Sequence, residues 1–501
     1  MIFLKKPPLS KGGGFFDENQ KRRGDSSQKN RWKKKNPSTV RTATVPLHLS
    51  KGGNIIKGSL SMRLFIAICI CRVLYFIGRL IGKGTAKPGD IARIFCPKVL
   101  NRLKFDGKII CITGTNGKTT TSNMVTHILR KNGFSVINNS FGSNMLGGIT
   151  TSLLTNCTFS GRVKADYSVL EIDERWLRFL VKEIKPDYLL ITNLLRDQIV
   201  RNCCPEIVLD KIKMGITPGT TLLLNANDPV SQQVSWGNEN PVVWFALGEN
   251  ERSTKECRSG TNDAKVCPKC MHTLSYDYYH YNHVGSFHCE NCGFESPKAD
   301  FIGTDMDFAE PSLAVNGKRV KLGFDATYFM FNTVAASAIC VTAAGMELEK
   351  VLSFAESFDI GVTKRYEELT VLGRKCQLIL TKQNPASVDQ SVDFVSEKEG
   401  PRTLIMISNN MFHTEHKDVL FMYDVAYENL RDVEHIIIVG KRRYDMAVRL
   451  KFADIDMEKV QICDNDGDIR SCLEKTEGNI YVMTSSVFSN EDKFLEELRK
   501  L

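Results

Sequence analysis

The chain has 501 residues, of which 42% are hydrophobic and 25% charged, and its formal net charge is +10. This composition is ordinary for a soluble globular protein, and the length excludes a single hydrophobic core and favours two to four domains. The excess charge belongs to residues 1–61, which hold 14 Lys or Arg against 3 Asp or Glu. The remaining chain is therefore close to neutral, which excludes a basic field over the whole protein of the kind that binds nucleic acid.

Residues 1–61 contain the run Lys33-Lys34-Lys35, several glycines and few apolar side chains. Such a segment buries too little surface to offset its chain entropy, so we expect a disordered basic tail. The alternative is that translation starts at Met62 and that the preceding residues are an artefact of the gene model.

An apolar run from Leu64 to Gly82 is interrupted by Arg72 and Arg79. Arginine near the centre of a membrane span is costly, so we expect a packed or interfacial amphipathic helix within an N-terminal helical segment, residues 62–100, and not a span. No small-residue cleavage site follows the run, so a signal peptide is not expected.

The next segment predicts a strand, a glycine-containing turn and a helix, at Lys108–Thr113 and Thr120–Lys131. Further strand candidates alternate with helix-like stretches, and they are Tyr167–Ile172, Tyr188–Thr192, Thr221–Asn225 and Val242–Leu247. This alternation favours a parallel sheet covered by helices on both faces.

Residues of about 256–300 break the pattern with two Cys-x-x-Cys pairs that are 18 residues apart, Cys267 with Cys270 and Cys289 with Cys292. This spacing predicts a zinc ribbon with a closed, structural, four-cysteine site. Nearby histidines are weaker ligand candidates: His272, His280, His283 and His288. The remaining cysteines are scattered, as in a cytosolic protein with reduced thiols.

A helix is predicted at Tyr328–Gly345, and a second α/β block begins at about residue 366. Its strand candidates are Cys376–Thr381, Thr403–Ser408, His435–Val439 and Asn479–Thr484. Gly440 follows one of these strands and precedes a helix-like stretch, Tyr444–Phe452.

The glycine-rich turn reads Thr-Gly-Thr-Asn-Gly-Lys-Thr-Thr over residues 113–120. Glycines let the backbone wrap a phosphate, and the following helix offers free N–H groups at its N-terminus. Lys118 can reach the β- and γ-phosphates of a nucleotide, and the Thr119 hydroxyl can bind Mg²⁺. Ile112 occupies the position of the first glycine in the general phosphate-loop spacing.

Acidic residues, Glu171-Ile172-Asp173-Glu174, close the next predicted strand. A carboxylate at the carboxyl end of a strand faces the ligand crevice of an α/β sheet and could hold Mg²⁺. Read without the phosphate loop, the same residues fit a solvated acidic loop.

The sequence TGTNGKTTT at residues 113–121 resembles the phosphate loop of the Mur ligase family, where it replaces the general spacing. Three further segments resemble Mur ligases in general: Glu171–Glu174, Asn225–Pro229 and Phe331–Ala336. The ribbon inside the central domain resembles the MurT branch of that family, as do Thr192–Gln198 and Gly440–Ala447, and the resemblance covers residues 62–501.

The resemblance implies an α/β fold with a Mur-ligase central parallel-sheet domain at 101–365, a ribbon inserted at about 257–300, and a C-terminal Rossmann-like domain at 366–501. It implies the cofactors ATP, Mg²⁺ and Zn²⁺, with Mg²⁺ on Thr119 and Glu171. The implied nucleotide-binding residues are Gly114, Thr115, Asn116, Gly117, Lys118, Thr119, Thr120, Glu171 and Asn332.

The activity that the resemblance implies is ATP-dependent amidation, in peptidoglycan biosynthesis, of the D-glutamate α-carboxylate of lipid II to D-isoglutamine through an acyl phosphate. A GatD-type glutaminase partner would supply ammonia, and Lys118 would serve catalysis. In the MurT family an aspartate of the ligase completes the partner's Cys–His pair, and Asp418 is the first match, with Asp424 as the fallback. The implied location is the cytoplasm, including a peripheral position at the inner face of the membrane.

Three departures from the family pattern keep alternatives open, and the first is that the glycine and the Ser-Trp pair of the family segment around Asp418 are lost. Ser387 replaces the glycine of an Asn-Pro-Ala-Gly motif, and Val200–Cys204 replaces Asp-Arg-Tyr-Gly-Glu. The alternatives are a Mur-type ligase that adds an amino acid, as folylpolyglutamate and muramyl-peptide ligases do, a zinc-ribbon nucleic-acid-binding ATPase with a basic arm, and a Mur-like scaffold without catalysis.

Overall fold

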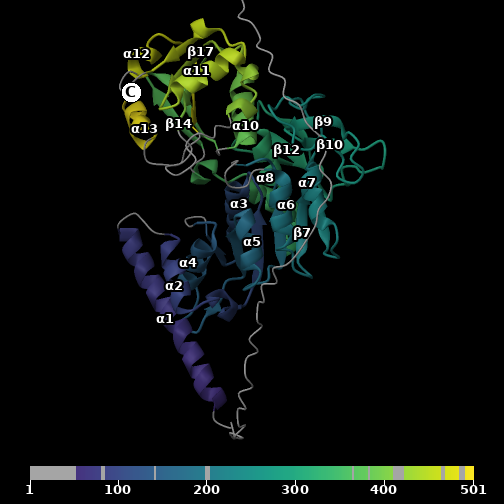
Figure 1. Cartoon of the computed structure of the whole chain (residues 1–501), viewed down its shortest axis with the longest axis vertical. Coiled ribbons are helices and arrows are strands. Elements are labelled where there is room, and N and C mark those ends of the chain that lie inside the picture. Colours follow the sequence, from purple (N-terminus) through teal and green to yellow (C-terminus); the bar gives the residue numbers. More distant parts are fainter. Residues whose placement is uncertain are drawn as a thin grey trace, which may run out of the picture. The chain divides into compact units, whose positions relative to one another are not determined.

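The computed structural model describes residues 52–80, 85–139, 143–197, 204–363, 366–381, 384–409, 422–463, 469–484 and 491–501. Residues Asn54–Leu501 form one compact unit, and the architecture described here is that of this unit. It begins with helix α1 (Gly52–Leu80), helix α2 (Lys87–Phe95) and the short helix η1 (Val99–Arg102), of which α1 and α2 lie in purple beside α4 in Figure 1.

Helix α1 starts well before the apolar run that predicts it. Its inner side buries Leu64, Ala67, Ile68 and Cys71 against the body of the protein. Arg72 is tolerated within this apolar helix because its guanidinium donates hydrogen bonds to the carbonyl oxygens at the end of α4, including that of Leu154 (3.2 Å). The helix is therefore packed along one side, as expected.

Two helices in the described chain are long and apolar enough to cross a membrane by composition alone, Ser61–Leu80 within α1 and Thr327–Ala344, which is α8. Helix α8 is 72% buried and is a core helix, whereas the α1 segment is only 28% buried. The outer side of α1 thus presents apolar residues to solvent.

The middle domain contains a sheet that has nine strands within the described residues, in the order β13-β12-β11-β8-β7-β6-β2-β5-β3. The strands from β3 to β11 run parallel, and β12 and β13 join antiparallel. Their bounds are β2 Lys108–Thr113, β3 Val136–Asn138, β5 Tyr167–Glu171, β6 Tyr188–Ile191, β7 Thr221–Asn225, β8 Val242–Leu247, β11 Phe301–Asp307, β12 Ser312–Val315 and β13 Lys318–Lys321. A separate parallel pair is formed by β1 (Lys104–Phe105) and β4 (Arg162–Val163).

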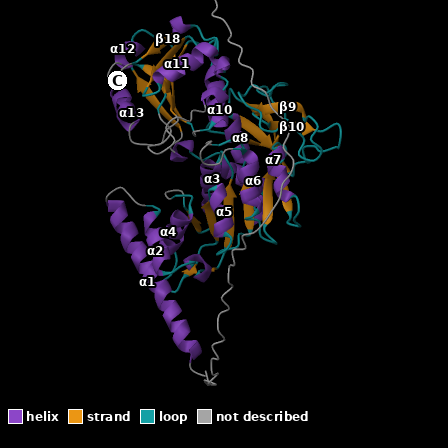
Figure 2. Cartoon of the chain, in the orientation of Figure 1, coloured by secondary structure: helices purple, strands orange, loops and turns teal. Residues whose placement is uncertain are grey.

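Both faces of this sheet are buried, as the side chains of β2 demonstrate. Ile110 and Ile112 pack into one core, and Ile109 and Cys111 pack into another, because successive side chains of a strand point to opposite faces. Figure 2 shows the strands in orange between purple helices. The first core contains α3 (Lys118–Lys131), α8 (Thr327–Ala344) and α9 (Leu348–Ala355), and the second contains α4 (Leu146–Asn156), α5 (Glu174–Leu180), α6 (Pro205–Lys213) and α7 (Pro229–Gln232), which η2 (Gln233–Ser235) follows.

The C-terminal domain has a second sheet, with the order β14-β15-β19-β16-β17-β18 among the described strands, in which only β14 is antiparallel. Its strands are β14 Tyr366–Val371, β15 Arg374–Leu380, β16 Arg402–Ile407, β17 His435–Val439, β18 Val460–Ile462 and β19 Asn479–Thr484. Its helices are α10 Pro385–Ser396, α11 Arg443–Phe452, α12 Ile469–Leu473 and α13 Glu491–Lys500, with short helices η3 Ile360–Thr363, η4 Met422–Asp424, η5 Tyr427–Leu430 and η6 Met457–Lys459.

The predicted α/β fold with a second α/β block is confirmed. Each predicted strand is present with ends within two residues of the predicted ones, and α3 begins at Lys118, two residues before the predicted start. The strands that were not predicted are β1, β3, β4, β9 (Ser275–Tyr281), β10 (Val284–His288), β11, β12, β13, β14 and β18.

Candidate active site and zinc ribbon

The loop between β2 and α3 depends on two glycines with positive φ, Gly114 (126°) and Gly117 (83°). A Cβ atom on Gly114 would lie 2.3 Å from the Thr192 hydroxyl, and one on Gly117 would lie 2.3 Å from Oδ1 of Asn332. Both the backbone conformation and the space therefore require glycine.

The segment that follows β6 holds this loop in place. The backbone N–H of Thr115 donates to the carbonyl of Asn193 (2.8 Å), and that of Asn116 donates to the Asn193 side chain (2.9 Å). The Thr192 hydroxyl donates to the Asn116 carbonyl (2.5 Å). Thr192 and Asn193 belong to the segment that resembles a MurT motif. Through these hydrogen bonds they clamp the phosphate loop, which means that they fix its conformation.

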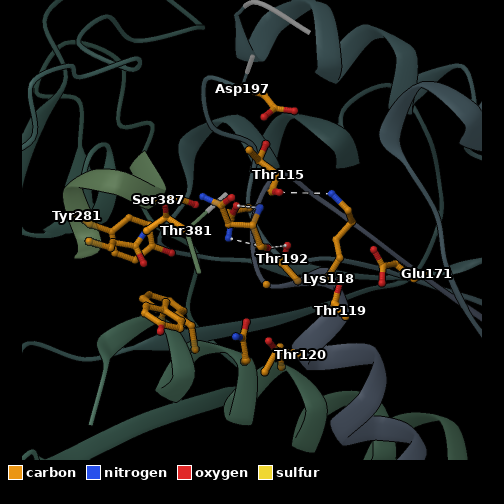
Figure 3. A pocket seen from close by; sticks show the side chains of 18 of the residues that line it. Thr115, Lys118, Thr119, Thr120, Glu171, Thr192, Asp197, Tyr281, Thr381 and Ser387 are labelled. Atoms are coloured by element: carbon orange, nitrogen blue, oxygen red, sulfur yellow. Dashed lines mark hydrogen bonds between the residues drawn. The ribbon is translucent and has the colours of Figure 1, made fainter. Parts of the chain in front are cut away.

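Lys118 is buried beside an acidic cluster. Its Nζ donates to Oε1 of Glu174 (2.6 Å) and to the carbonyl of Gly114. Burial acts to lower the pKa of Lys118, but the negative charges of Glu174, Glu171 and Asp173 outweigh it and raise the pKa above its usual value. Lys118 therefore keeps its positive charge at the wall of the cavity, near Glu171 in Figure 3.

Oxygen ligands for a divalent cation gather at the end of β5. Glu171 is the last residue of this strand, and its carboxylate accepts a hydrogen bond from Nδ2 of Asn144 (3.2 Å). The side chain of Asn139 holds the backbone of Glu171 through two hydrogen bonds of 2.8 Å. Its Nδ2 donates to the Glu171 carbonyl, and its Oδ1 accepts from the Glu171 N–H. With the Thr119 hydroxyl lining the same cavity, the donor set is one of carboxylate and hydroxyl oxygens, which fits Mg²⁺.

These residues surround one cavity of about 200 Å³. Every residue predicted to bind the nucleotide lines it except Gly114, whose place is at the turn of the loop. The opposite wall is aromatic, and Figure 3 shows Tyr281 there, across the loop from Lys118. The aromatic side chains of this wall are Phe245, Tyr281, Tyr328 and Phe331.

Asn332 of α8 lines the cavity and contacts Thr121 of α3, the helix that follows the loop. Its Oδ1 accepts a hydrogen bond from the Thr121 hydroxyl (3.2 Å), while its buried Nδ2 has no hydrogen-bond partner among the described residues. A buried donor without a partner is costly, so this amide fits a ligand that carries an acceptor group. The glycine cradle, the cation, the oxygen ligands and this donor together fit a nucleotide with its metal ion.

The C-terminal domain completes the cavity through the start of α10. Asn384 caps this helix by accepting a hydrogen bond from the Ser387 N–H (2.9 Å), and its Nδ2 donates to Oδ1 of Asn116 (3.0 Å). Ser387, Gln390 and Ser391 line the cavity. The sequence pattern did not assign Asn384 a role, although Asn followed by Pro is a common start of a helix.

Asp197 of the Arg-Asp-Gln segment also lines the cavity, and its Oδ1 lies 3.5 Å from Nδ2 of Asn384. The preceding Arg196 points elsewhere and binds Asp263 (2.9 Å) and, more weakly, the fallback candidate Asp424 (3.5 Å). Asp424 is the last residue of η4 and is partly exposed. Asp418, the first candidate, lies outside the described residues, as do Val200–Cys203.

The four cysteines of the predicted ribbon converge. All their Sγ atoms lie within 4.8 Å of one another, and Cys267–Cys292 and Cys270–Cys289 are each 3.5 Å apart. The hairpin of β9 (Ser275–Tyr281) and β10 (Val284–His288) connects the two pairs. Four thiols at these separations fit one tetrahedral zinc ion with no open position.

Within the described residues none of the four histidines belongs to the cysteine cluster, and three of them make other contacts. Burial lowers the pKa of His280 to about 4, and its Nε2 donates to the carbonyl of Leu247 (3.2 Å). His283 is fully buried and donates to the Asp228 carboxylate (3.2 Å). His288 lies 3.3 Å from Asp277.

Asp228 links the ribbon to the phosphate-loop clamp. Its carboxylate accepts the hydrogen bond from His283, caps α7 at the N–H groups of Val230 and Ser231, and accepts from the N–H of Leu194 (2.7 Å). One buried carboxylate thus joins the hairpin of the ribbon to the segment that clamps the phosphate loop.

Comparison with known proteins gives the following similarities. The family model described as Mur ligase middle domain matches residues 112–292, and that described as MurT ligase C-terminal matches residues 380–486. The chain is 31% identical over 404 residues, 79% of its own length and 89% of the relative, to the protein of Staphylococcus aureus (strain N315) named lipid II isoglutaminyl synthase (glutamine-hydrolyzing) subunit MurT. It is 27% identical to the protein of that name from Streptococcus pneumoniae (strain ATCC BAA-255 / R6), over 83% of this chain and 92% of the relative.

Among solved structures, the fold is similar to that of a pseudomurein peptide ligase type C from Methanothermus fervidus, with a TM-score of 0.61, 19% identity and 80% of each chain covered. It is also similar to that of MurF ligase from Thermotoga maritima in complex with ADP, with a TM-score of 0.54, 17% identity and 83% of each chain covered. At these identities the likeness concerns the fold.

Proposed function

The chain belongs to the MurT family of Mur ligases, a family of ATP-dependent ligases, and from this premise we propose that it is the synthetase subunit of a lipid II isoglutaminyl synthase. It would amidate the α-carboxylate of the D-glutamate residue of lipid II, giving D-isoglutamine in peptidoglycan biosynthesis. The observation that carries this proposal is that one cavity unites the glycine loop, Lys118, Glu171 and Asn332 with residues of the C-terminal domain.

The reaction would begin with transfer of the γ-phosphoryl group of ATP to the substrate carboxylate, which gives an acyl phosphate and ADP. Ammonia then attacks the acyl carbon, the bond to the phosphate oxygen breaks, and an amide and inorganic phosphate leave. Activation is needed because a carboxylate is a poor electrophile, whereas the acyl phosphate, a mixed anhydride, has phosphate as a good leaving group.

The chain's own residues supply positioning and charge. The phosphate loop, fixed by Thr192 and Asn193, would hold the phosphates, and Lys118 would exchange its contact with the Gly114 carbonyl for a phosphoryl oxygen. The orphan amide of Asn332 would donate to the nucleotide. Mg²⁺, held by Glu171 and the Thr119 hydroxyl, would supply further positive charge against the phosphates.

The zinc ribbon would have a structural role. Its four cysteines would occupy all positions of a tetrahedral ion and leave none for a substrate. Through the contacts of Asp228 and His283 it would support the turn behind the phosphate loop.

Ammonia would come from a glutaminase subunit, because the relatives carry the words glutamine-hydrolyzing and subunit in their names. Asp418 remains the first candidate for orienting the histidine of that partner, and Asp424 the second, although Asp424 already faces Arg196. The substrate is lipid-linked, so the protein would act in the cytoplasm at the inner surface of the membrane.

A reconstitution with a GatD-type glutaminase, lipid II, ATP, Mg²⁺ and glutamine tests this function. We expect one ADP for each amidated stem peptide by mass spectrometry, and the same product from the ligase alone with ammonium chloride. ATP turnover that requires an amino acid and yields a peptide-extended product would instead assign an amino-acid-adding Mur ligase, and failure of every nitrogen source would overturn the proposal.

A further inference from the structure

Helix α1 carries a second apolar face in addition to the one it buries. At 100° per residue, the buried residues Leu64, Ala67, Ile68 and Cys71 fall within an arc of about 100° on one side. From Phe65 onward, six exposed apolar residues fall within an arc of about 120° on the opposite side: Phe65, Ile66, Val73, Phe76, Ile77 and Leu80. We call these six residues the outer stripe.

The exposure of the outer stripe is large for apolar side chains. Phe76 is 66% exposed and Leu80 is 72% exposed. Single apolar residues on a surface are common, but a continuous stripe along about four turns of one helix marks an interaction surface. Figure 1 shows α1 at the edge of the domain, along its whole length.

The charged residues of α1 are all basic. The helix contains no Asp or Glu. By helical geometry Arg63 lies about 40° beyond one edge of the outer stripe and Arg79 about 40° beyond the other, and both are exposed. An apolar face bordered on both sides by basic residues fits a membrane surface with anionic headgroups, since the side chains can reach phosphates while the stripe enters the acyl region.

The packing of α1 favours a helix that lies in the membrane surface over one that spans it. The inner face is part of the protein core, and the Arg72 guanidinium is bound to backbone carbonyls and stacks on Phe159 at 4.5 Å. A spanning helix would have to give up these contacts. A soluble partner protein would explain the apolar stripe but not the basic residues on both borders.

We propose that the outer stripe of α1, flanked by Arg63 and Arg79, docks the protein on an anionic bilayer surface. The role deepens the proposed function and rests on it in one respect: a lipid-linked substrate stays within reach of the cavity when the enzyme is held at the membrane. The docking itself follows from α1 alone and needs neither ATP nor substrate.

Vesicle flotation tests the proposal with the full chain and vesicles of phosphatidylglycerol and phosphatidylcholine. Because residues 1–61 are strongly basic, binding is compared at low salt and at about 0.5 M salt, where contacts of exposed charges are screened. We expect binding to persist at high salt, and Phe76→Ser combined with Ile77→Ser to weaken it by about tenfold or more, since two exposed apolar side chains no longer enter the bilayer.

Phe452→Ser is the matched control, because Phe452 is a phenylalanine on α11 that is at least as exposed as Phe76, and this variant should bind vesicles as the unaltered chain does. Equal vesicle binding by the double variant, or no binding at high salt by the unaltered chain, would overturn the docking role. The docking role would also be overturned if the unaltered chain were a dimer in vesicle-free solution and the double variant a monomer. The stripe would then bind a second copy of the chain and not a membrane. Amidation of a short-chain, water-soluble substrate should be unchanged in the double variant, which separates failure of docking from failure of the proposed enzyme.

Discussion

The side-chain amide of Asn384 donates a hydrogen bond to Oδ1 of Asn116 over 3.0 Å. Asn384 begins α10 of the C-terminal domain, whereas Asn116 lies in the middle of the phosphate loop. The two domains therefore meet at the glycine-rich loop between β2 and α3. The position of the C-terminal domain and the shape of the phosphate loop are coupled through this pair.

Replacement of Asn384 by Ala should slow ATP turnover by about tenfold or more and cost about 1 kcal/mol of unfolding free energy, the usual cost of losing a helix cap. Asp456→Ala is the matched control, because it removes the cap of η6 far from the cavity. Its ATP turnover should be normal. Steady-state kinetics and urea unfolding of both variants make the comparison, and equal turnover in the two would deny the contact a role.

Lys118→Ala should abolish ATP turnover and also destabilise the chain by about 3 kcal/mol, because it leaves the buried Glu174 carboxylate without its cation. Lys118→Ala combined with Glu174→Gln should recover much of that stability and none of the activity. Chemical unfolding and phosphate release separate the two effects. Near-normal ATP turnover in a folded Lys118→Ala protein would refute the phosphate-loop assignment.

The protein purified without chelator should contain one zinc ion per chain, bound by the four ribbon cysteines. Cys289→Ser should lose the ion and lower the melting temperature by several degrees, since structural zinc contributes folding free energy. Cys257→Ser, at a half-buried cysteine outside the cluster, is the control and should keep its zinc. Elemental analysis and thermal unfolding provide the readouts, and zinc-free native protein would contradict the site.

The pH dependence of stability should show the titration of Asp389 on α10. Burial raises the pKa of this carboxyl to about 8, while one oxygen accepts a hydrogen bond from the Ala426 N–H (2.7 Å). The fold favours the protonated form, so its contribution is complete below the ordinary aspartate pKa of about 4 and is lost progressively as the pH rises from there to about 8. Asp389→Asn retains the acceptor but cannot ionise.

Between pH 5 and pH 8 we expect the unaltered chain to lose on the order of 1 kcal/mol or more of unfolding free energy through this group. The Asp389→Asn variant should lose less, and Asp432→Asn, at an exposed position, should behave as the unaltered chain does. Urea unfolding at the two pH values measures the difference. Parallel pH profiles of the unaltered chain and Asp389→Asn would contradict the assignment.

Glutamine hydrolysis should need a partner subunit, whereas ammonia-dependent amidation should not. In the reconstituted pair, Asp418→Asn should reduce the glutamine-dependent rate steeply and spare the ammonia-dependent rate, since it removes only the group that orients the partner's histidine. Equal loss with both nitrogen sources would indicate a role in the ligase itself. Normal rates with both would transfer the role to Asp424, whose replacement by Asn is then tested in the same assay.

Local pattern was sufficient for the framework of the fold. Short apolar runs located β2, β6 and β7 because these strands are buried on both faces. The edge strands escaped prediction: β13 reads Lys-Arg-Val-Lys, which is polar because it borders solvent, and β3 has only three residues. Edge strands depend on pairing with neighbours and less on their own composition.

The site was predictable where it is contiguous in sequence. The residues of the glycine loop lie close together in sequence, as do those of each cysteine pair. The structure places the loop residues around one cavity and the four cysteines in one cluster. The contact of Asn384 with Asn116, and that of Glu174 with Lys118, join residues 268 and 56 positions apart. Such pairs arise from the tertiary fold and have no local signature.

The four hydrogen bonds on Asp228 determine how freely the ribbon can be altered. A shortened chain that replaced the hairpin by a tight turn would delete His283 and also Gly285, which exchanges hydrogen bonds with Asn227. The charge on Asp228 and the amide of Asn227 would then remain inside the protein without these partners. Any graft of a different insert at this site must carry its own donor to Asp228, so the ribbon cannot be exchanged as an independent module.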